Sequence, residues 1–233
     1  MSENDLAVWN LVSDISQGLQ MSFASIKAAI SSLLDPDIIW DQQAQHEFMQ
    51  TIDDSVDGLS DLTAVMTVAM RVESQSLAIH REPNSLQEIL SQAQDQVQQR
   101  TPATTIVLTL PAEARMGYLD FAYFRMALCL LMEVLIGAGD RVMAVLSIQL
   151  LENSTGWKIT FEGDFSGVRD LIGWFCYDAP DCALLPATVR PETRLKALTA
   201  YQLLRLHAIE MVTNGEGGDR KALTLHIPFE AEA

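Results

Sequence analysis

The 233-residue sequence is poor in cysteine and in basic residues. Its three cysteines, Cys129, Cys176 and Cys182, are too few for a disulfide scaffold, so we expect free thiols in a reducing, cytoplasmic setting. Cys176 and Cys182 match no common zinc spacing. Only 15 lysines and arginines oppose 31 acids, and the resulting net charge of −16 argues against nucleic acid or anionic lipid as a partner.

The sequence also lacks a targeting segment and a long uninterrupted hydrophobic run. Residues 1–5 are acidic, whereas a signal peptide begins with basic residues. The longest apolar run, near residues 127–138, is interrupted by Glu133 and is shorter than the roughly 20 residues that cross a membrane. These absences predict a soluble, cytoplasmic protein without a membrane partner.

What the chain does contain divides it into two parts. Hydrophobic residues make up 48% of it, which is enough to bury a core. Residues 1–100 carry 15 acids and four bases, a balance of −11, and residues 101–233 carry 16 acids and 11 bases, a balance of −5. Because the hydrophobic pattern changes at the same place, we expect one domain at residues 1–80 and a second at residues 81–233.

The first domain is predicted to be a helical hairpin. Its first helix ends before Pro36, and its second runs from about residue 41 to residue 73. A lone hairpin leaves its apolar seam half exposed, so we expect two copies to pair in a dimeric four-helix bundle. In the first helix, residues spaced by four and three form the seam, at Val8, Val12, Ile15, Leu19, Ser22, Ile26, Ala29 and Leu33. The apolar positions of the second helix include Phe48, Ile52, Val56, Leu59, Leu62, Met66 and Ala69.

The second domain is predicted to be an α/β sandwich, which makes the whole chain α+β. A capping box at Ser85 and Glu88 opens a helix to about residue 99, and an apolar helix spans residues 120–136. Strands are expected at residues 104–110, 141–151, 157–162 and 222–229, and residues 164–190 read as irregular. A last helix is expected from Pro191 to about residue 213. This order describes a mixed sheet with helices on one face.

Two segments resemble the core of two-component sensor histidine kinases. Residues 73–90 (ESQSLAIHREPNSLQEIL) resemble the bridge from the second bundle helix into the catalytic domain. Residues 119–135 (LDFAYFRMALCLLMEVL) resemble the first helix of the ATP site. The resemblance spans nearly the whole chain and implies a dimerisation and histidine-phosphotransfer hairpin followed by an ATPase-like domain of the kind shared with gyrase and Hsp90.

The positions that carry phosphotransfer chemistry in that family are changed in the hairpin. Aligned through Ile26, the phosphoacceptor histidine, the following acid and the later proline correspond to Gln17, Gly18 and Ser22. A glutamine has no nucleophilic ring nitrogen, so Gln17 cannot form a phosphohistidine.

The positions that hold nucleotide are changed as well. The asparagine that helps to bind magnesium corresponds to Val134, which offers no oxygen ligand. In the adenine-reading loop, Gly163 and Phe165 take the places of the aspartate and glycine, with Asp164 displaced by one residue. The glycine-rich phosphate loop corresponds to residues 196–202, which contain no glycine but include Leu198 and Tyr201.

Two further features have alternative interpretations. His46 offers an imidazole on the second helix, but a solvated helix residue is the favoured interpretation, and His207 and His226 are interpreted as structural. Trp174 and Phe175 either fill the empty nucleotide site or present a surface to a partner, or, as we favour, they belong to a helical turn that packs on the sheet.

The sequence therefore predicts a homodimeric, non-catalytic, histidine-kinase-like signalling protein, with no catalytic, cofactor-binding or metal-binding residue assigned. By resemblance, its partner is a response-regulator receiver domain. The alternatives are a histidine phosphotransfer protein that uses His46 and a diverged kinase that still binds ATP.

Overall fold

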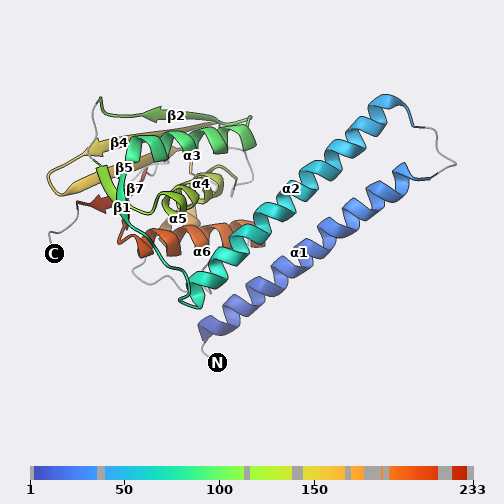
Figure 1. The fold of residues 1–233 in the computed structure, drawn as a ribbon, viewed down its shortest axis with the longest axis horizontal. Coiled ribbons are helices and arrows are strands. Elements are labelled where there is room, and N and C mark those ends of the chain that lie inside the picture. Colours follow the sequence, from blue (N-terminus) through green and yellow to red (C-terminus); the bar gives the residue numbers. More distant parts are fainter. Residues whose placement is uncertain are drawn as a thin grey trace.

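A long helical hairpin projects from an α/β sandwich in the computed structural model of the chain (Figure 1). The structure describes residues 3–35, 40–112, 116–137, 144–165, 169–175, 185, 189–214 and 222–229. The predicted order, a hairpin followed by a sandwich with an α+β composition, is confirmed. In the described part of the chain, no helix is both long enough and apolar enough to cross a membrane.

The hairpin consists of α1 (Glu3–Leu33) and α2 (Gln42–Glu73), which contact each other along their length. Asp41 caps α2, because its carboxylate accepts a hydrogen bond of 2.7 Å from the backbone N–H of Ala44. Trp40 joins the two helices at this end. Its indole N–H donates to the Ser32 carbonyl at 3.0 Å, and its ring meets Phe48 edge-on at 4.9 Å.

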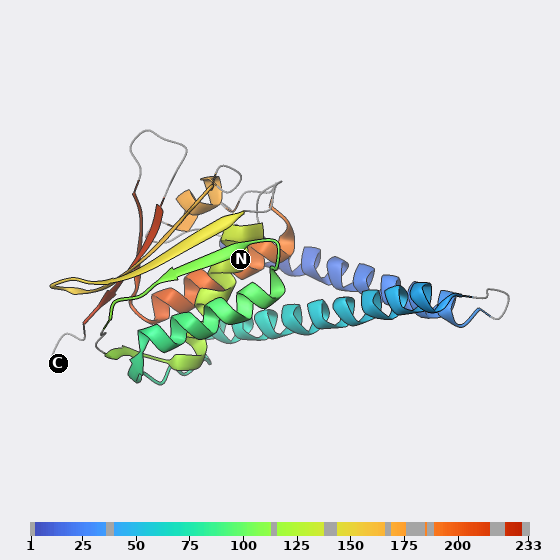
Figure 2. The ribbon, with the colours of Figure 1, turned by 90° about the horizontal axis from the view of Figure 1, so that it is seen from above.

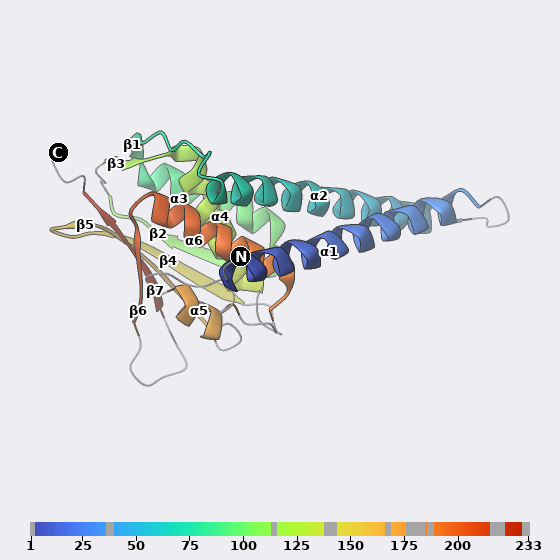
Figure 3. The ribbon, with the colours of Figure 1, turned by 90° about the horizontal axis from the view of Figure 1, so that it is seen from below.

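The sandwich contains a five-stranded sheet in the order β2-β4-β5-β7-β6. Strand β2 (Thr105–Thr109) is parallel to β4 (Val145–Glu152), and the other pairings, among β4, β5 (Gly156–Gly163), β7 (Ala222–Pro228) and β6 (Glu210–Asn214), are antiparallel. Helices α3 (Leu86–Arg100), α4 (Phe121–Gly137) and α6 (Pro191–Leu206) cover one face of it (Figures 2 and 3). This arrangement confirms the predicted mixed sheet with helices on one face.

Local sequence explains several boundaries of these elements. The Ser85 hydroxyl accepts from the Glu88 N–H at 3.3 Å and begins α3, as the capping box predicts. Between β4 and β5, the Asn153 side chain accepts from the Gly156 N–H at 2.8 Å. Residue 156 must be glycine here, since a Cβ atom would collide with the Ile227 carbonyl oxygen of β7.

The predicted helix from Pro191 to residue 213 is too long. Helix α6 ends at Leu206, because Ala208 adopts a left-handed conformation with φ of 57° and the Ile209 N–H turns back to the Leu204 carbonyl at 3.1 Å. Burial then alternates along the chain, and Met211 faces the core from the edge strand β6.

Three shorter elements were not fully predicted from the sequence. Strands β1 (Glu82–Ser85) and β3 (Met116–Leu119) form a separate antiparallel pair, and α5 (Arg169–Phe175) extends the helical turn expected at Trp174 and Phe175 into a short helix within the segment expected to be irregular. Helix α5 contacts β6. Helix α6 contacts both α1 and α2, so it forms the contact between the sandwich and the hairpin.

Candidate functional site

The site is the region where the resemblance places nucleotide, between α4, the end of β5, α5 and α6. Val134 lies on α4 with no exposed surface, because the inward side of this helix packs in the core. Gly163 ends β5 opposite Leu146 of β4, the Asp164 side chain is exposed, and Phe165 is buried. The described side chains at the expected metal and adenine positions are therefore either apolar and buried or directed to solvent.

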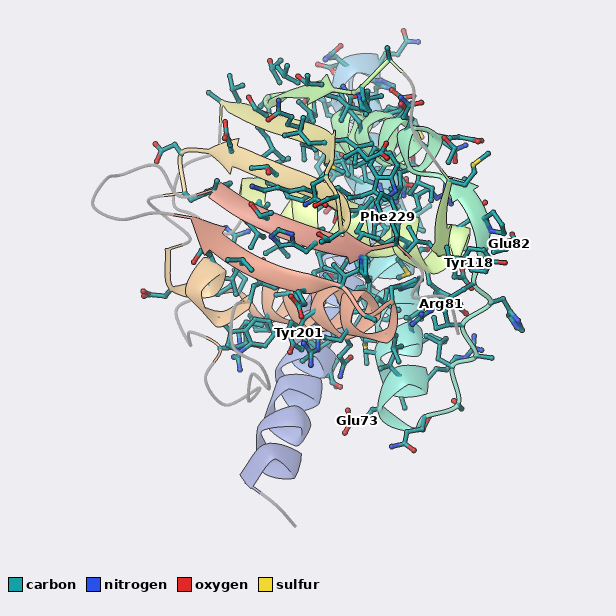
Figure 4. All side chains as sticks on the ribbon, turned by 90° about the vertical axis from the view of Figure 1, so that its left-hand side faces the viewer. Glu73, Arg81, Glu82, Tyr118, Tyr201 and Phe229 are labelled. Atoms are coloured by element: carbon teal, nitrogen blue, oxygen red, sulfur yellow. The ribbon has the colours of Figure 1, made fainter. Side chains whose placement is uncertain are left out.

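Three aromatic side chains from α5 and α6 pack together. The Trp174 ring lies 5.3 Å from the Phe175 ring and 5.4 Å from the Tyr201 ring, measured between centroids. All three side chains are buried, and Tyr201 is labelled on α6 in Figure 4. The favoured interpretation of Trp174 and Phe175 as part of a helical turn is confirmed, and Trp174 reaches α6 within the stretch 196–202, which the resemblance aligns with the glycine-rich loop.

A chain of ion pairs crosses the same region. The Glu133 carboxylate, on the residue before Val134, lies 2.6 Å from the Lys196 ammonium of α6 and 3.1 Å from a guanidinium nitrogen of Arg100. A second guanidinium nitrogen lies 2.9 Å from the Asp61 carboxylate of α2. Burial by itself lowers the pKa of Arg100, but the hydrogen bonds and charges of Glu133 and Asp61 outweigh it and raise the pKa above its usual value.

The residues predicted at the hairpin site are less fully described. Gln17 and Gly18 lie on α1, but their side chains are outside the described residues. The neighbouring Ile15 has no exposed surface, and Leu19 is half-buried. His46 is exposed near the start of α2, in keeping with a solvated helix residue.

The sequence analysis missed a polar junction between the linker and the sandwich. The Asp120 carboxylate accepts from the His80 N–H at 3.0 Å, and the Asp120 N–H donates to Nε2 of His207 at 3.2 Å. The other ring nitrogen of His207 lies 2.7 Å from the Leu203 carbonyl. Arg81 donates to the Leu206 carbonyl at 2.7 Å, beside the C-terminal end of α6 (Figure 4). Local patterns give no signal for this junction, because its partners lie 40 to 125 residues apart.

The geometry of His207 defines its protonation state. A carbonyl oxygen only accepts, so Nδ1 carries the proton and donates to Leu203, which leaves Nε2 to accept from Asp120. Burial is the largest cause of a lowered His207 pKa, and the charge of Arg81 acts in the same direction. His207 is thus a neutral, structural link between α6 and α4, as interpreted from the sequence.

Histidine, cysteine, aspartate and glutamate side chains are the candidate ligands for a metal ion. Among the side chains that the structure describes, no three from His, Cys, Asp or Glu lie close enough together to hold a metal ion. Cys129 is a buried free thiol, whereas Cys176 and Cys182 lie outside the described residues.

Comparison with known proteins identifies the fold. No family model and no curated protein matches the chain. The Acinetobacter baumannii histidine kinase AdeS matches with a TM-score of 0.66 and 15% identity, over 92% of this chain and 98% of that one. Full-length ShkA in complex with AMPPNP matches with a TM-score of 0.57 and 14% identity, over 96% of this chain and 46% of that one. A structure described as a bacterial phosphotransferase matches with a TM-score of 0.53 and 13% identity, over 97% of this chain and 98% of that one.

The fold of the chain is therefore that of a histidine-kinase core, in which a helical hairpin precedes an ATPase-like sandwich. At sequence identities of 13–15%, these matches establish the fold alone. The chemistry must be argued from the residues of this chain.

Proposed function

We propose that this protein is a non-catalytic, histidine-kinase-like signalling protein that acts through protein–protein contacts. The observation that carries the proposal is the Glu133–Lys196 ion pair of 2.6 Å between α4 and α6. By resemblance, these helices supply the magnesium-binding asparagine and the phosphate loop of an active kinase. Here they are joined to each other, and the Val134 and Tyr201 side chains on the same two helices are buried.

The aromatic contact between α5 and α6 supports the same conclusion. A nucleotide needs backbone amides that approach its phosphates, which glycine permits and a bulky side chain prevents. The stretch 196–202 is helical, contains no glycine and packs Tyr201 against Trp174. A triphosphate bound there has to displace packed aromatic side chains.

Incubation with labelled ATP and magnesium tests the proposal directly. We expect no acid-labile phosphate on the protein and no shift in melting temperature on adding nucleotide, since a ligand of the native state raises apparent stability. An active histidine kinase, treated identically, serves as the positive control. Phosphate uptake or nucleotide-dependent stabilisation would show instead that the chain is a diverged kinase.

We propose that the hairpin forms a homodimer. Helix α2 exposes Met49, Val56 and Met70, which are 55%, 45% and 64% exposed and are separated by multiples of seven residues. Helix α1 exposes Phe23 and Ile30, also seven residues apart, and Leu34 is exposed directly after the helix. Pairing with a second copy would bury these two rows in a four-helix bundle.

Sedimentation of the full chain tests the dimer. Val56→Asp is expected to shift the population towards monomer, because it places an unpaired charge in the paired face. Gln50→Asp, an exposed position on the same helix, is the matched control and should remain dimeric. A monomeric wild-type chain at micromolar concentration would contradict the proposal.

The partner proposed by resemblance is a receiver domain that docks on the hairpin. The variant Gln17→His tests docking without ATP, because it places an imidazole at the position aligned with the phosphoacceptor. Transfer of phosphate from a receiver domain to this ring would then report docking on the hairpin. We expect Gln17→His, and not the wild type, to take phosphate from a phosphorylated receiver domain. Failure across a panel of receivers from the source cell would exclude this class of partner.

A second candidate is a histidine phosphotransfer protein, favoured by the match to a structure described as a bacterial phosphotransferase. His46 is the one histidine before residue 80, and it is exposed on α2. Phosphate uptake by the wild type from a receiver, abolished by His46→Ala, would establish this function in place of the first.

A further inference from the structure

Arg100 connects the hairpin to the sandwich. It is the last residue of α3, and two of its guanidinium nitrogens bind carboxylates on different helices: Asp61 of α2 at 2.9 Å and Glu133 of α4 at 3.1 Å. Glu133 in turn binds Lys196 of α6 at 2.6 Å. Four helices are thus linked through one continuous chain of charges.

The middle of this chain is more buried than its end. The side chain of Glu133 is 9% exposed and both of its oxygens are paired, so this half of the chain is an internal part of the sandwich. The Arg100 and Asp61 side chains are 42% and 41% exposed. Glu133 therefore holds the Arg100 guanidinium in place, and the outer pair, Arg100–Asp61, joins it to the hairpin. This outer pair is accessible to water and salt.

Beside Asp61, the hairpin turns an apolar surface towards the sandwich. Leu62, Val65 and Ile15 are 8%, 4% and 0% exposed, and they belong to one continuous core with α6. Helix α6 contacts both hairpin helices. On α1, Ile15 lies two residues from Gln17, the position aligned with the phosphoacceptor.

We propose that Arg100 is a salt-sensitive latch that holds the sandwich over this apolar surface of the hairpin. Apolar contact supplies most of the attraction between the sandwich and the hairpin. The Arg100–Asp61 pair fixes where the sandwich sits along α2 and favours the closed state, in which the sandwich covers the apolar surface. Opening the latch exposes Ile15, Leu62 and Val65 beside position 17. The inference rests on the contact between hairpin and sandwich, and it holds whether or not the chain binds nucleotide or a receiver domain.

Alkylation of a thiol introduced by Val65→Cys measures how often the sandwich separates from the hairpin. The full chain is used, and its native thiols are removed by Cys129→Ala, Cys176→Ser and Cys182→Ser. The introduced thiol reacts with iodoacetamide only when the sandwich lifts, so its rate reports the open fraction. Asp61→Asn removes the outer pair alone and should raise the rate about two- to fivefold, the range expected for a half-exposed ion pair. Asp57→Asn, at an exposed position one turn away on α2, is the matched control and should leave the rate unchanged, because Arg100 pairs with Asp61.

Salt and a second variant complete the test. About 1 M salt should accelerate alkylation of the parent but not of Asp61→Asn, because the screened interaction is already absent. Arg100→Lys should give an intermediate rate, since a single ammonium does not span both carboxylates as a guanidinium does. The latch is refuted if Asp61→Asn and Asp57→Asn react equally, if the thiol reacts in none of the variants, or if the parent already reacts as fast as the unfolded chain.

Discussion

The indole ring of Trp174 on α5 lies 5.4 Å from the phenol ring of Tyr201 on α6, measured between centroids and with a tilt of 59° between the planes. This geometry is within the range of favourable aromatic pairs. The contact joins the seven-residue helix α5 to the sixteen-residue helix α6, so a short element becomes part of the core.

Trp174→Ala is therefore expected to lower the free energy of unfolding by about 3–5 kcal/mol, the cost of removing a large buried aromatic side chain. The side chain is 1% exposed, so little relaxation of its surroundings can fill the space. Urea denaturation measures the change. Tyr118→Ala, at a position 45% exposed on β3, is the control and should change stability by less than about 1 kcal/mol.

The lowered pKa of His207 makes the stability of the folded chain depend on pH. Its pKa in the folded chain lies below the ordinary value of 6.5, so the unfolded chain takes up the proton first as pH falls. The contribution of His207 is complete above about pH 6.5 and is lost progressively as pH drops towards the folded pKa. We expect the melting temperature to fall as pH drops below about 6.5, where the histidine of the unfolded chain becomes protonated first.

The variant His207→Gln should flatten that part of the pH profile while lowering stability at neutral pH. His46→Gln, at an exposed position, should leave the profile as in the wild type. An unchanged slope in His207→Gln would show that another group causes the pH dependence.

Gln98 protects the free edge of the sheet. Its amide donates to the Thr104 carbonyl at 2.7 Å and accepts from the Ile106 N–H at 2.9 Å, on the side of β2 that faces away from β4. Gln98→Ala leaves two backbone groups without these bonds and should cost about 1–3 kcal/mol. Chemical denaturation checks this, and Gln99→Ala, an exposed neighbour, should be nearly neutral. Equal stability of the two variants would mean that water replaces the amide at no cost.

Cys129 is expected to be unreactive in the folded protein. Burial, with a smaller contribution from the charge of Glu133, raises the pKa of its thiol from 9.0 to about 11. That rise of 11 − 9 = 2 units lowers the thiolate fraction about 100-fold at a given pH. In a Cys176→Ser, Cys182→Ser background, alkylation at about pH 8 should be at least that much slower than in urea. Comparable rates in the two conditions would place the thiol at the surface.

Much of the fold was predictable because its signals are local. The Asp41 cap, the Ser85 capping box and the turn at Gly156 each act within a few residues, and each lies at the start of a helix or strand in the structure. The end of α6 was not predictable in this way. Residues 207–213 continue a helix-compatible pattern, and only pairing with β7 converts part of them into strand β6.

The hairpin, the sandwich and the residue types at the aligned positions, including Gln17 and Val134, follow from the amino-acid sequence, because hydrophobic periodicity, helix caps and side-chain chemistry are local properties. The contacts of Glu133 with Lys196, of Trp174 with Tyr201 and of Arg100 with α2 arise when the elements pack together. These contacts join residues 27 to 63 positions apart, and nothing local specifies which surfaces meet when the helices pack.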